Sequence, residues 1–184
     1  LMQRLGRKLL FRGRKVAQPG VQIDINLERP RSLGNVHLAS ADPHDLPRID
    51  PNYFSDPQDL DEMVRGVKAM RKIMAMPQIS QYLTGEVGPW KGAISDAQII
   101  EAIRATAYTG HHPCSTARMG PEGDPTAVLD DQLRVKGTEN LRVCDASAMP
   151  TQITGNPTAT VIAMSEKAAD LILRRDLLSS EDIT

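Results

Sequence analysis

Two adjacent histidines and a cysteine gather in the middle of the chain, within the segment TGHHPCSTARMG at residues 109–120. His111, His112 and Cys114 are all residue types that bind zinc. Neighbouring side chains of an extended segment point to opposite sides, so the two imidazoles cannot easily share one ion. The sequence holds no second ligand pair at zinc spacing. A metal site is therefore disfavoured, and a catalytic base or a plain structural role remains for the histidines.

A helix start near the end of the chain is the second feature that could do chemistry. The stretch GNPT, which contains Asn156 and Pro157, follows a DAS segment at 145–147 by only a few residues. A helix N-terminus carries unpaired N–H groups and a positive partial charge. It suits a phosphate, a carboxylate or a reduced cofactor ring. Alternatively, Asn156 serves only as the N-cap of the helix.

The elements that must position these residues begin with a sheet. In VQIDINLERP, apolar residues alternate with polar ones over 21–27, which predicts a half-buried strand. RSLGNVHLAS predicts a turn at Gly34-Asn35 and a short strand through Val36 and Leu38. We expect the two strands to form an antiparallel hairpin, within a sheet over 21–50.

Three helices and one further strand are predicted beyond residue 50. Asp56 and Pro57 start a helix over 57–75, and a capping box of Ser95 and Gln98 starts another over 96–106. LRVCDAS at 141–147 predicts a strand. A long helix follows over 157–174, with Asn156 as its cap and one broad face expected to be buried, formed by Val161, Ile162, Met164, Ala168, Leu171 and Ile172.

Composition and charge narrow the functional class. The 184 residues are 40% hydrophobic and 24% charged, as in soluble globular proteins. A formal net charge of −1 and 3% aromatic residues argue against a nucleic-acid partner. No apolar run approaches the roughly 18 residues of a membrane span, so membrane association is not expected. Two cysteines without a disulfide framework fit a reducing compartment, and we expect the cytoplasm.

Three blocks in order resemble one known family. HHPCSTARMG, then AVLDDQLRVKGTENLRVCDASAMP, then TGNPTATVIAMSEKAADLI are similar to the C-terminal part of the glucose–methanol–choline (GMC) flavoprotein oxidoreductases. The upstream stretch ERPRSLGNVHLASADPHDLPRIDPNYFSDPQDL resembles the substrate-domain strands of that family. The resemblance covers roughly residues 20–174.

The resemblance implies a role for six residues. His112 matches the active-site histidine of the family, and Asn156 matches its second active-site position. His111 is a neighbour of uncertain role, and Cys114 has no thiolate-stabilising partner in the sequence. The remaining matches are FAD contacts: Asp145 and Ala146 at a strand end, and Pro157 and Thr158 where the backbone approaches the flavin.

The implied reaction suits these residue types. Alcohol oxidation needs a group that takes the hydroxyl proton, and histidine titrates near neutrality. Asn156 can hydrogen-bond the substrate oxygen in either charge state. FAD accepts the hydride in such enzymes.

The resemblance also implies an α/β (α+β) fold: an antiparallel substrate-domain sheet with flanking helices, plus the closing strand and helix of a Rossmann-like FAD domain. The expected divisions are a basic connecting segment at 1–20, a substrate-binding domain at 21–138, the FAD-domain elements at 139–174 and a tail at 175–184. No G-x-G-x-x-G turn occurs in the sequence. The expected partners are therefore an N-terminal FAD-binding half of the same protein and a small alcohol substrate. FAD is expected in the complete enzyme but not on this chain alone, and the start at Leu1 suggests a piece of a longer protein.

Two alternatives stay open at this point. A hydroxynitrile-lyase-like member would bind the flavin without reducing it. A non-catalytic fragment or assembly module would keep only the fold.

Overall fold

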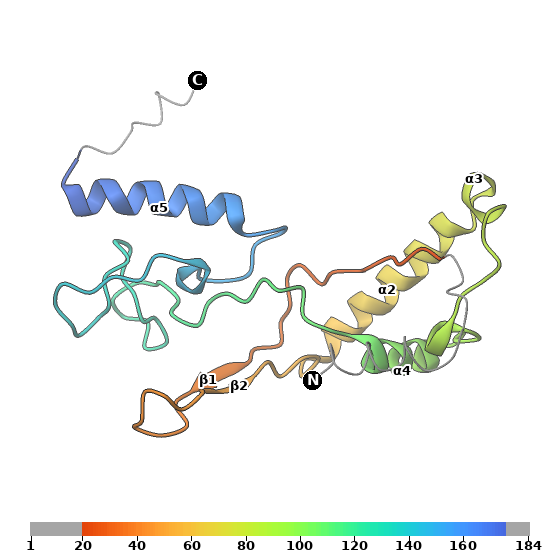
Figure 1. The fold of residues 1–184 in the computed structure, drawn as a ribbon, viewed down its shortest axis with the longest axis horizontal. Coiled ribbons are helices and arrows are strands. Elements are labelled where there is room, and N and C mark those ends of the chain that lie inside the picture. Colours follow the sequence, from red (N-terminus) through yellow and green to blue (C-terminus); the bar gives the residue numbers. More distant parts are fainter. Residues whose placement is uncertain (1–19, 176–184) are drawn as a thin grey trace.

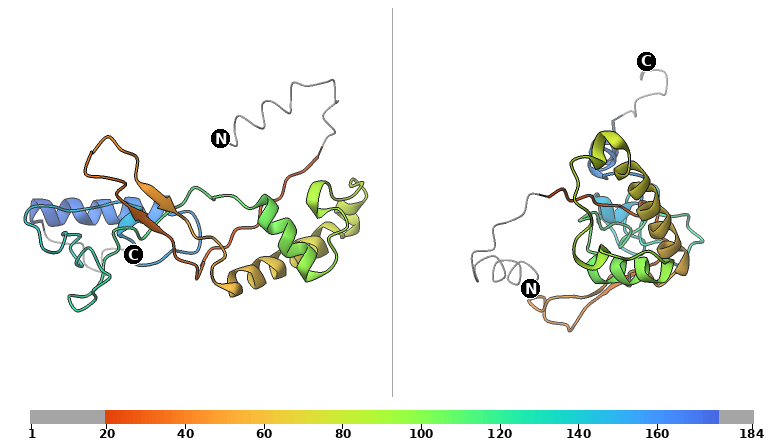
Figure 2. Two further views of the ribbon diagram at one scale, coloured as in Figure 1. Left: turned by 90° about the horizontal axis from the view of Figure 1, so that it is seen from below. Right: turned by 90° about the vertical axis from the view of Figure 1, so that its right-hand side faces the viewer.

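Two separate hydrophobic clusters organise residues 20–175, the part of the chain that the computed structural model describes. They lie toward opposite ends of an elongated molecule, with extended segments running between them (Figures 1 and 2). The predicted basic segment and the predicted tail fall, except for residues 20 and 175, outside the described residues.

The first cluster is built by α2 (Pro57–Met74) and α4 (Asp96–Thr106), with the short 3-10 helix η1 (Gly88–Trp90) beside α4. A single turn, α3 (Pro77–Ser80), follows α2. The buried side chains of this cluster come from α2, from α4 and from the loop before α4: Leu60, Val64, Val67, Ala93, Ile99 and Ile103.

Local capping explains where both long helices begin. An Asp56 carboxylate oxygen accepts a hydrogen bond from the Gln58 backbone N–H at 2.9 Å, and Pro57 occupies the first turn. The Ser95 hydroxyl accepts from the Gln98 backbone N–H at 3.3 Å, and the Gln98 side chain accepts from the Ser95 N–H at 3.0 Å. These contacts satisfy N–H groups that have no partner within the helix. The predicted helices over 57–75 and 96–106 are confirmed.

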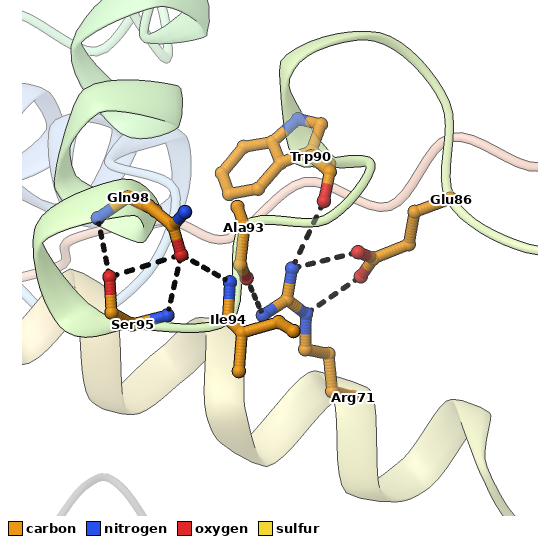
Figure 3. Close-up of polar contacts among 7 residues, drawn as sticks. All are labelled: Arg71, Glu86, Trp90, Ala93, Ile94, Ser95 and Gln98. Atoms are coloured by element: carbon orange, nitrogen blue, oxygen red, sulfur yellow. Dashed lines mark hydrogen bonds and ion pairs between the residues drawn. The ribbon is translucent and has the colours of Figure 1, made fainter.

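Arg71 of α2 forms hydrogen bonds to the loop between α3 and α4 (Figure 3). The Arg71 guanidinium donates two hydrogen bonds to the Glu86 carboxylate, both of 2.7 Å. A third bond, from Nη1, reaches the Ala93 carbonyl oxygen at 2.7 Å. The planar fork of an arginine can make such a set of bonds at once, whereas lysine cannot.

A buried carboxylate ties the start of α2 to residues 31–32. Asp59 is 1% exposed and accepts hydrogen bonds from the Arg31 N–H at 2.9 Å, the Ser32 N–H at 2.9 Å and the Ser32 hydroxyl at 2.5 Å. Burial acts to raise the pKa of this carboxyl, but the hydrogen bonds from Arg31 and Ser32 outweigh it and lower the pKa.

The only sheet within residues 20–175 is a hairpin of β1 (Asn35–His37) and β2 (Arg48–Asp50). Its antiparallel register pairs Asn35 with Asp50 and His37 with Arg48. Gly34 is required at its base, because a Cβ there would collide with the Asp50 carbonyl oxygen. The predicted strand through Val36 is confirmed, but it ends at His37, before Leu38, and its partner is 48–50. The predicted turn at Gly34-Asn35 is wrong, because Asn35 is already paired with Asp50.

The predicted strand over 21–27 is wrong. These residues form no strand and pair with no sheet within the described part of the chain, and Val21 is 73% exposed. The alternation of apolar and polar residues indicated one buried face, but a strand also needs a neighbouring backbone to pair with. The strand that pairs with β1 is β2 and not the segment 21–27.

The second cluster packs the loops of 119–148 beneath α5 (Thr158–Leu173). Its buried members are Leu129, Leu133, Ala148 and Ala168. Isolated bridges join Met119 to Leu129 and Leu129 to Val135, so the loops contact one another without forming a sheet. A short 3-10 helix, η2 (Ala146–Ala148), lies in this cluster.

The predicted strand LRVCDAS is also wrong. It makes one isolated bridge, Arg134 with Arg142, and then turns into η2 with Asp145 as the N-cap. The backbone bonds of 141–143 go to the loop at 133–135, as in Val143 N–H to Leu133 O at 3.1 Å, which is too short a pairing for a ladder. The structure therefore has mixed helices and a small antiparallel sheet.

Helix α5 is one residue shorter at each end than predicted, and its buried face is narrower. Ala168 is buried, and Val161, Met164 and Leu171 are half-buried. Ile162 and Ile172, which were expected to be buried, are 59% and 58% exposed. The loops of the second cluster cover only one side of the helix. No helix of residues 20–175 is both long and apolar enough to cross a membrane.

Candidate active site

The histidine segment runs along η2, which lies far from it in the sequence. The N–H groups of Ser115, Ala117 and Met119 donate to the carbonyl oxygens of residues 146, 147 and 148, at 3.3, 3.0 and 2.9 Å respectively. Three backbone bonds in a row fix the register of the two segments. The residues just after His112 are therefore held beside Ala146, one of the predicted FAD contacts.

A side-chain bond extends this contact toward Asn156. The Cys114 thiol donates to the Gln152 carboxamide oxygen at 3.2 Å, and both side chains are half-buried. Cys114 stands two residues after His112, and Gln152 stands four residues before Asn156. The structure thus brings the histidine segment, η2 and the approach to α5 into one region of the molecule. Cys114 and Gln152 were not predicted to touch.

The two histidines differ in their surroundings. His111 is exposed and adopts the left-handed conformation, with φ of 63°, which a non-glycine residue reaches at a cost of about 1–2 kcal/mol. Its N–H donates to the Thr109 hydroxyl at 3.0 Å, which supports this turn. His112 is half-buried. The segment is therefore not simply extended at this point, and the more enclosed imidazole is that of His112.

Asn156 does not cap α5, contrary to the prediction. The helix begins at Thr158 with Pro157 in the N-cap position, and no side chain accepts a hydrogen bond there. Pro157 has helical φ and ψ of −75° and −7°, and its carbonyl oxygen accepts the Val161 N–H at 2.9 Å. The helix start is displaced by only one residue from the predicted one, and the predicted capping bond from the Asn156 side chain is absent. Asn156 is exposed, and among the described residues no hydrogen bond occupies its carboxamide.

The predicted FAD contacts lie at two neighbouring turns. Asp145 is exposed and caps η2, because its carboxylate accepts the Ser147 N–H at 2.8 Å and the Ser147 hydroxyl. Ala146 and Pro157 are half-buried, and Thr158 is exposed. The first turn of α5 holds no acidic residue and no side-chain cap. Its N–H groups are therefore open to an anionic group of a ligand.

Within residues 20–175, no hydrogen bond joins His112 to Asn156, and no group of three His, Cys, Asp or Glu side chains is arranged to hold a metal ion.

Two residues beside the candidate site, Glu28 and Arg29, were not predicted to contribute to it. The Glu28 carboxylate accepts the Gly155 N–H at 2.6 Å, and the Arg29 Nε donates to the Thr154 hydroxyl at 2.8 Å. Both lie in VQIDINLERP directly after the predicted strand over 21–27, where charged residues are expected simply to face solvent. No local signal could have found them, because their partners lie more than a hundred residues further along the chain.

Known proteins of one family match this chain in sequence. A family model described as GMC oxidoreductase matches residues 30–165. The chain is 42% identical over 171 residues to an alcohol dehydrogenase [acceptor] of Pseudomonas putida, covering 92% of this chain and 31% of that protein. It is 41% identical over 165 residues to choline oxidase of Arthrobacter globiformis, covering 89% of this chain and 30% of that protein.

The fold is also similar to a solved structure. An FAD-dependent oxidoreductase from Chaetomium thermophilum superposes with a TM-score of 0.70 at 32% identity, over 77% of this chain and 24% of that one. The chain therefore spans less than a third of the length of each of these three relatives.

Proposed function

The chain belongs to the GMC oxidoreductase family, and from this premise we propose that it works as the C-terminal part of an FAD-dependent alcohol oxidoreductase of the choline type. The proposal is supported above all by the hydrogen bonds that join the residues after His112 to η2 and to Gln152, which stands four residues before Asn156.

In this proposal His112 takes or relays the hydroxyl proton of the alcohol. A half-buried imidazole keeps one side open to a substrate while the protein fixes its backbone. A histidine side chain ordinarily gains and loses a proton near neutral pH, which suits a general base. The exposed His111 is the less suitable of the two.

Asn156 holds the substrate oxygen. A carboxamide has both donor and acceptor atoms, so it can bond an alcohol, an alkoxide or the carbonyl product. The absence of a capping bond leaves those atoms available, since α5 starts at Thr158. When FAD is bound, it accepts the hydride that leaves the alcohol carbon.

FAD is held in part by residues of this chain and in part by residues outside it. The N–H groups at the start of α5, behind Pro157 and Thr158, supply a positive partial charge for the flavin, and Asp145 and Ala146 contact the cofactor from η2. No G-x-G-x-x-G turn occurs in these 184 residues, so the pyrophosphate must be bound elsewhere.

An N-terminal FAD-binding half of the same protein supplies that remainder and covers the open side of α5. Ile162, Ile172 and Leu173 are each more than half exposed on this helix. The β1–β2 hairpin is likewise uncovered and presents exposed apolar side chains: Leu33, Val36, Leu38, Leu46 and Ile49. An isolated two-stranded hairpin is only marginally stable in water, so both surfaces need a partner. The relatives, which are more than three times as long as the matched region, contain sufficient chain to provide it.

The test is anaerobic mixing of the complete flavoprotein with choline and with simple primary alcohols, while flavin absorbance is followed. Bleaching of the oxidised flavin by an alcohol supports the proposal. Flavin that stays oxidised while the protein cleaves a cyanohydrin would point instead to lyase chemistry. A protein that binds flavin but reacts with neither substrate class would contradict the proposed activity.

A further inference from the structure

The loop that carries Asn156 is held from outside by two consecutive residues of a distant segment. Glu28 accepts the backbone N–H of Gly155, the residue directly before Asn156, at 2.6 Å. Arg29 donates to the hydroxyl of Thr154, the residue before that, at 2.8 Å. The two contacts act on adjacent residues, so they fix the loop in direction as well as in position.

The loop needs such support, because its own conformation is loosely determined. Gly155 has φ of 118°, a region that residues with a side chain rarely adopt and that glycine can leave easily. Pro157 offers no N–H, and the Asn156 side chain makes no capping bond that would anchor the loop to α5. The Glu28 bond is charge-assisted and short, and such bonds are stronger than those between neutral groups.

The supporting segment is itself anchored to the other hydrophobic cluster. Ile25 packs on α2 so closely that a Cβ at Gly66 would lie 2.8 Å from its Cγ2 atom. Residues 25–29 line a groove of about 490 Å³ together with Glu62, Met63 and Thr154. The position of Asn156 is therefore tied, through Glu28 and the packing of Ile25, to α2.

We propose that Glu28 is a positioning residue for Asn156, with Arg29 as its second contact. The carboxylate of Glu28 does not meet the substrate. It sets the backbone at Gly155 so that the Asn156 carboxamide faces the substrate oxygen. This inference rests on the proposed role of Asn156 in alcohol oxidation.

The first experiment compares Glu28→Ala and Glu28→Gln with a matched control in the complete flavoprotein. Glu62→Ala is the control, because Glu62 lines the same groove but pairs with Arg65 at 3.6 Å on the surface of α2. We expect Glu28→Ala to lower kcat about 10-fold to 100-fold, as small misplacements of substrate-orienting groups do, while KM and flavin content change little. Glu28→Gln keeps an oxygen acceptor for the Gly155 N–H and should recover most of the rate. Equal losses for Glu28→Ala and Glu62→Ala would overturn the inference.

A readout that does not depend on activity is the hydrogen exchange of peptides spanning 150–160. Loss of the Glu28 bond should speed exchange there about 10-fold. Exchange that is unchanged in Glu28→Ala would show that the loop holds its position without Glu28, and the inference would fall.

A double-mutant cycle then separates this inference from the proposed function. If Glu28 acts through Asn156, adding Glu28→Ala to Asn156→Ala should change kcat by less than about twofold. If the two losses multiply, Glu28 does not act through Asn156 and only the positioning role is overturned. If Asn156→Ala alone has wild-type kcat, the proposed role of Asn156 fails and the positioning role fails with it. Should Glu28→Ala lose its flavin, Arg29→Ala, which removes the second contact to the loop at Thr154, replaces it in the cycle and is judged in the same way.

Discussion

Cys114 and Gln152 join the two halves of the candidate active site through a single bond, from the Cys114 thiol to the Gln152 carboxamide oxygen at 3.2 Å. Cys114 stands two residues after the half-buried His112 and Gln152 four residues before Asn156, and the backbone pairing of 115–119 with 146–148 lies next to the bond. A neutral thiol is a weak donor, so the contact orients the segments more than it stabilises them. This contact gives Cys114 a structural role beside the proposed catalytic histidine that requires no redox chemistry.

Removing this thiol should affect the reaction more than the fold. For Cys114→Ala we expect a loss of no more than about 1 kcal/mol in the free energy of unfolding, the usual value for one neutral hydrogen bond. The rate of flavin reduction should fall several-fold, because the His112 segment is less well held. Cys114→Ser keeps a donor and should stay close to wild type in both thermal melting and stopped-flow bleaching. A Ser variant as impaired as the Ala variant would argue against the hydrogen bond as the cause.

The buried carboxylate of Asp59 should control the acid stability of the chain. Its pKa in the folded state is lowered from the ordinary value of 3.8, since the donors from Arg31 and Ser32 outweigh burial. A lowered folded pKa means that the stabilisation is fully present above the unfolded pKa and is lost as the pH falls through the folded value. Unfolding followed by circular dichroism should therefore show a loss of stability below about pH 4 that is smaller in Asp59→Asn, in which only the lowered pKa values of Asp24, Asp124 and Asp130 remain.

Truncation of the same residue should be costly at neutral pH. Asp59→Ala leaves two backbone N–H groups and one hydroxyl without their acceptor, and we expect a loss of about 3 kcal/mol in urea unfolding. Asp61 lies on the same helix and is exposed, so Asp61→Ala is the matched control and should change stability by less than about 0.5 kcal/mol. Similar losses in the two variants would contradict the structural role of Asp59.

The bidentate contact of Arg71 should not tolerate lysine. Arg71→Lys can keep one contact with Glu86 but loses the fork that also reaches the Ala93 carbonyl (Figure 3). We expect a loss of about 1–2 kcal/mol in stability and faster cleavage of the 81–95 loop in limited proteolysis. Arg65 is the control, because it stands on the same helix and its ion pair with Glu62 is long and exposed. Cleavage of Arg71→Lys at the rate of Arg65→Lys would refute the clamp.

The success of the sequence prediction depended on whether the information was local. Helices α2 and α4 were placed correctly because Asp56, Ser95 and Gln98 act within one turn of their own helix. The strand over 21–27 failed because strand pairing depends on a distant partner. The Asn156 cap failed because its side chain makes no bond to the first turn, although Pro157 directly after it has helical φ and ψ. The meeting of Cys114 with Gln152, and of Glu28 with Gly155, joins segments that no periodicity connects. The roles of His112 and Asn156 came from family resemblance, since their residue types alone also suited a structural role.

The isolated chain should bind FAD weakly or not at all. The start of α5 and η2 offer contacts for the flavin, but these 184 residues hold no glycine-rich turn for the pyrophosphate. Titration of the chain with FAD, followed by gel filtration and visible absorbance, should leave the protein fraction colourless at micromolar concentrations. A stoichiometric yellow complex would show that the cofactor site is more complete than proposed.

The two histidines should be separable by their effect on flavin reduction in the complete enzyme. His112→Ala removes the proposed proton acceptor and should slow bleaching by alcohol about 10²–10⁴-fold, the range for one acid–base group. His111→Ala should have a much smaller effect, because its side chain is exposed and its backbone bond to Thr109 does not need the imidazole. The flavin content of both variants should match wild type, since neither imidazole is proposed to hold the cofactor. Anaerobic stopped-flow measures the rate of flavin reduction in the two histidine variants and in Asn156→Ala. We expect the rate of Asn156→Ala to lie between the other two. A crippled His111→Ala beside a nearly wild-type His112→Ala would reverse the assignment, and equal small effects would remove histidine from the proposed proton transfer.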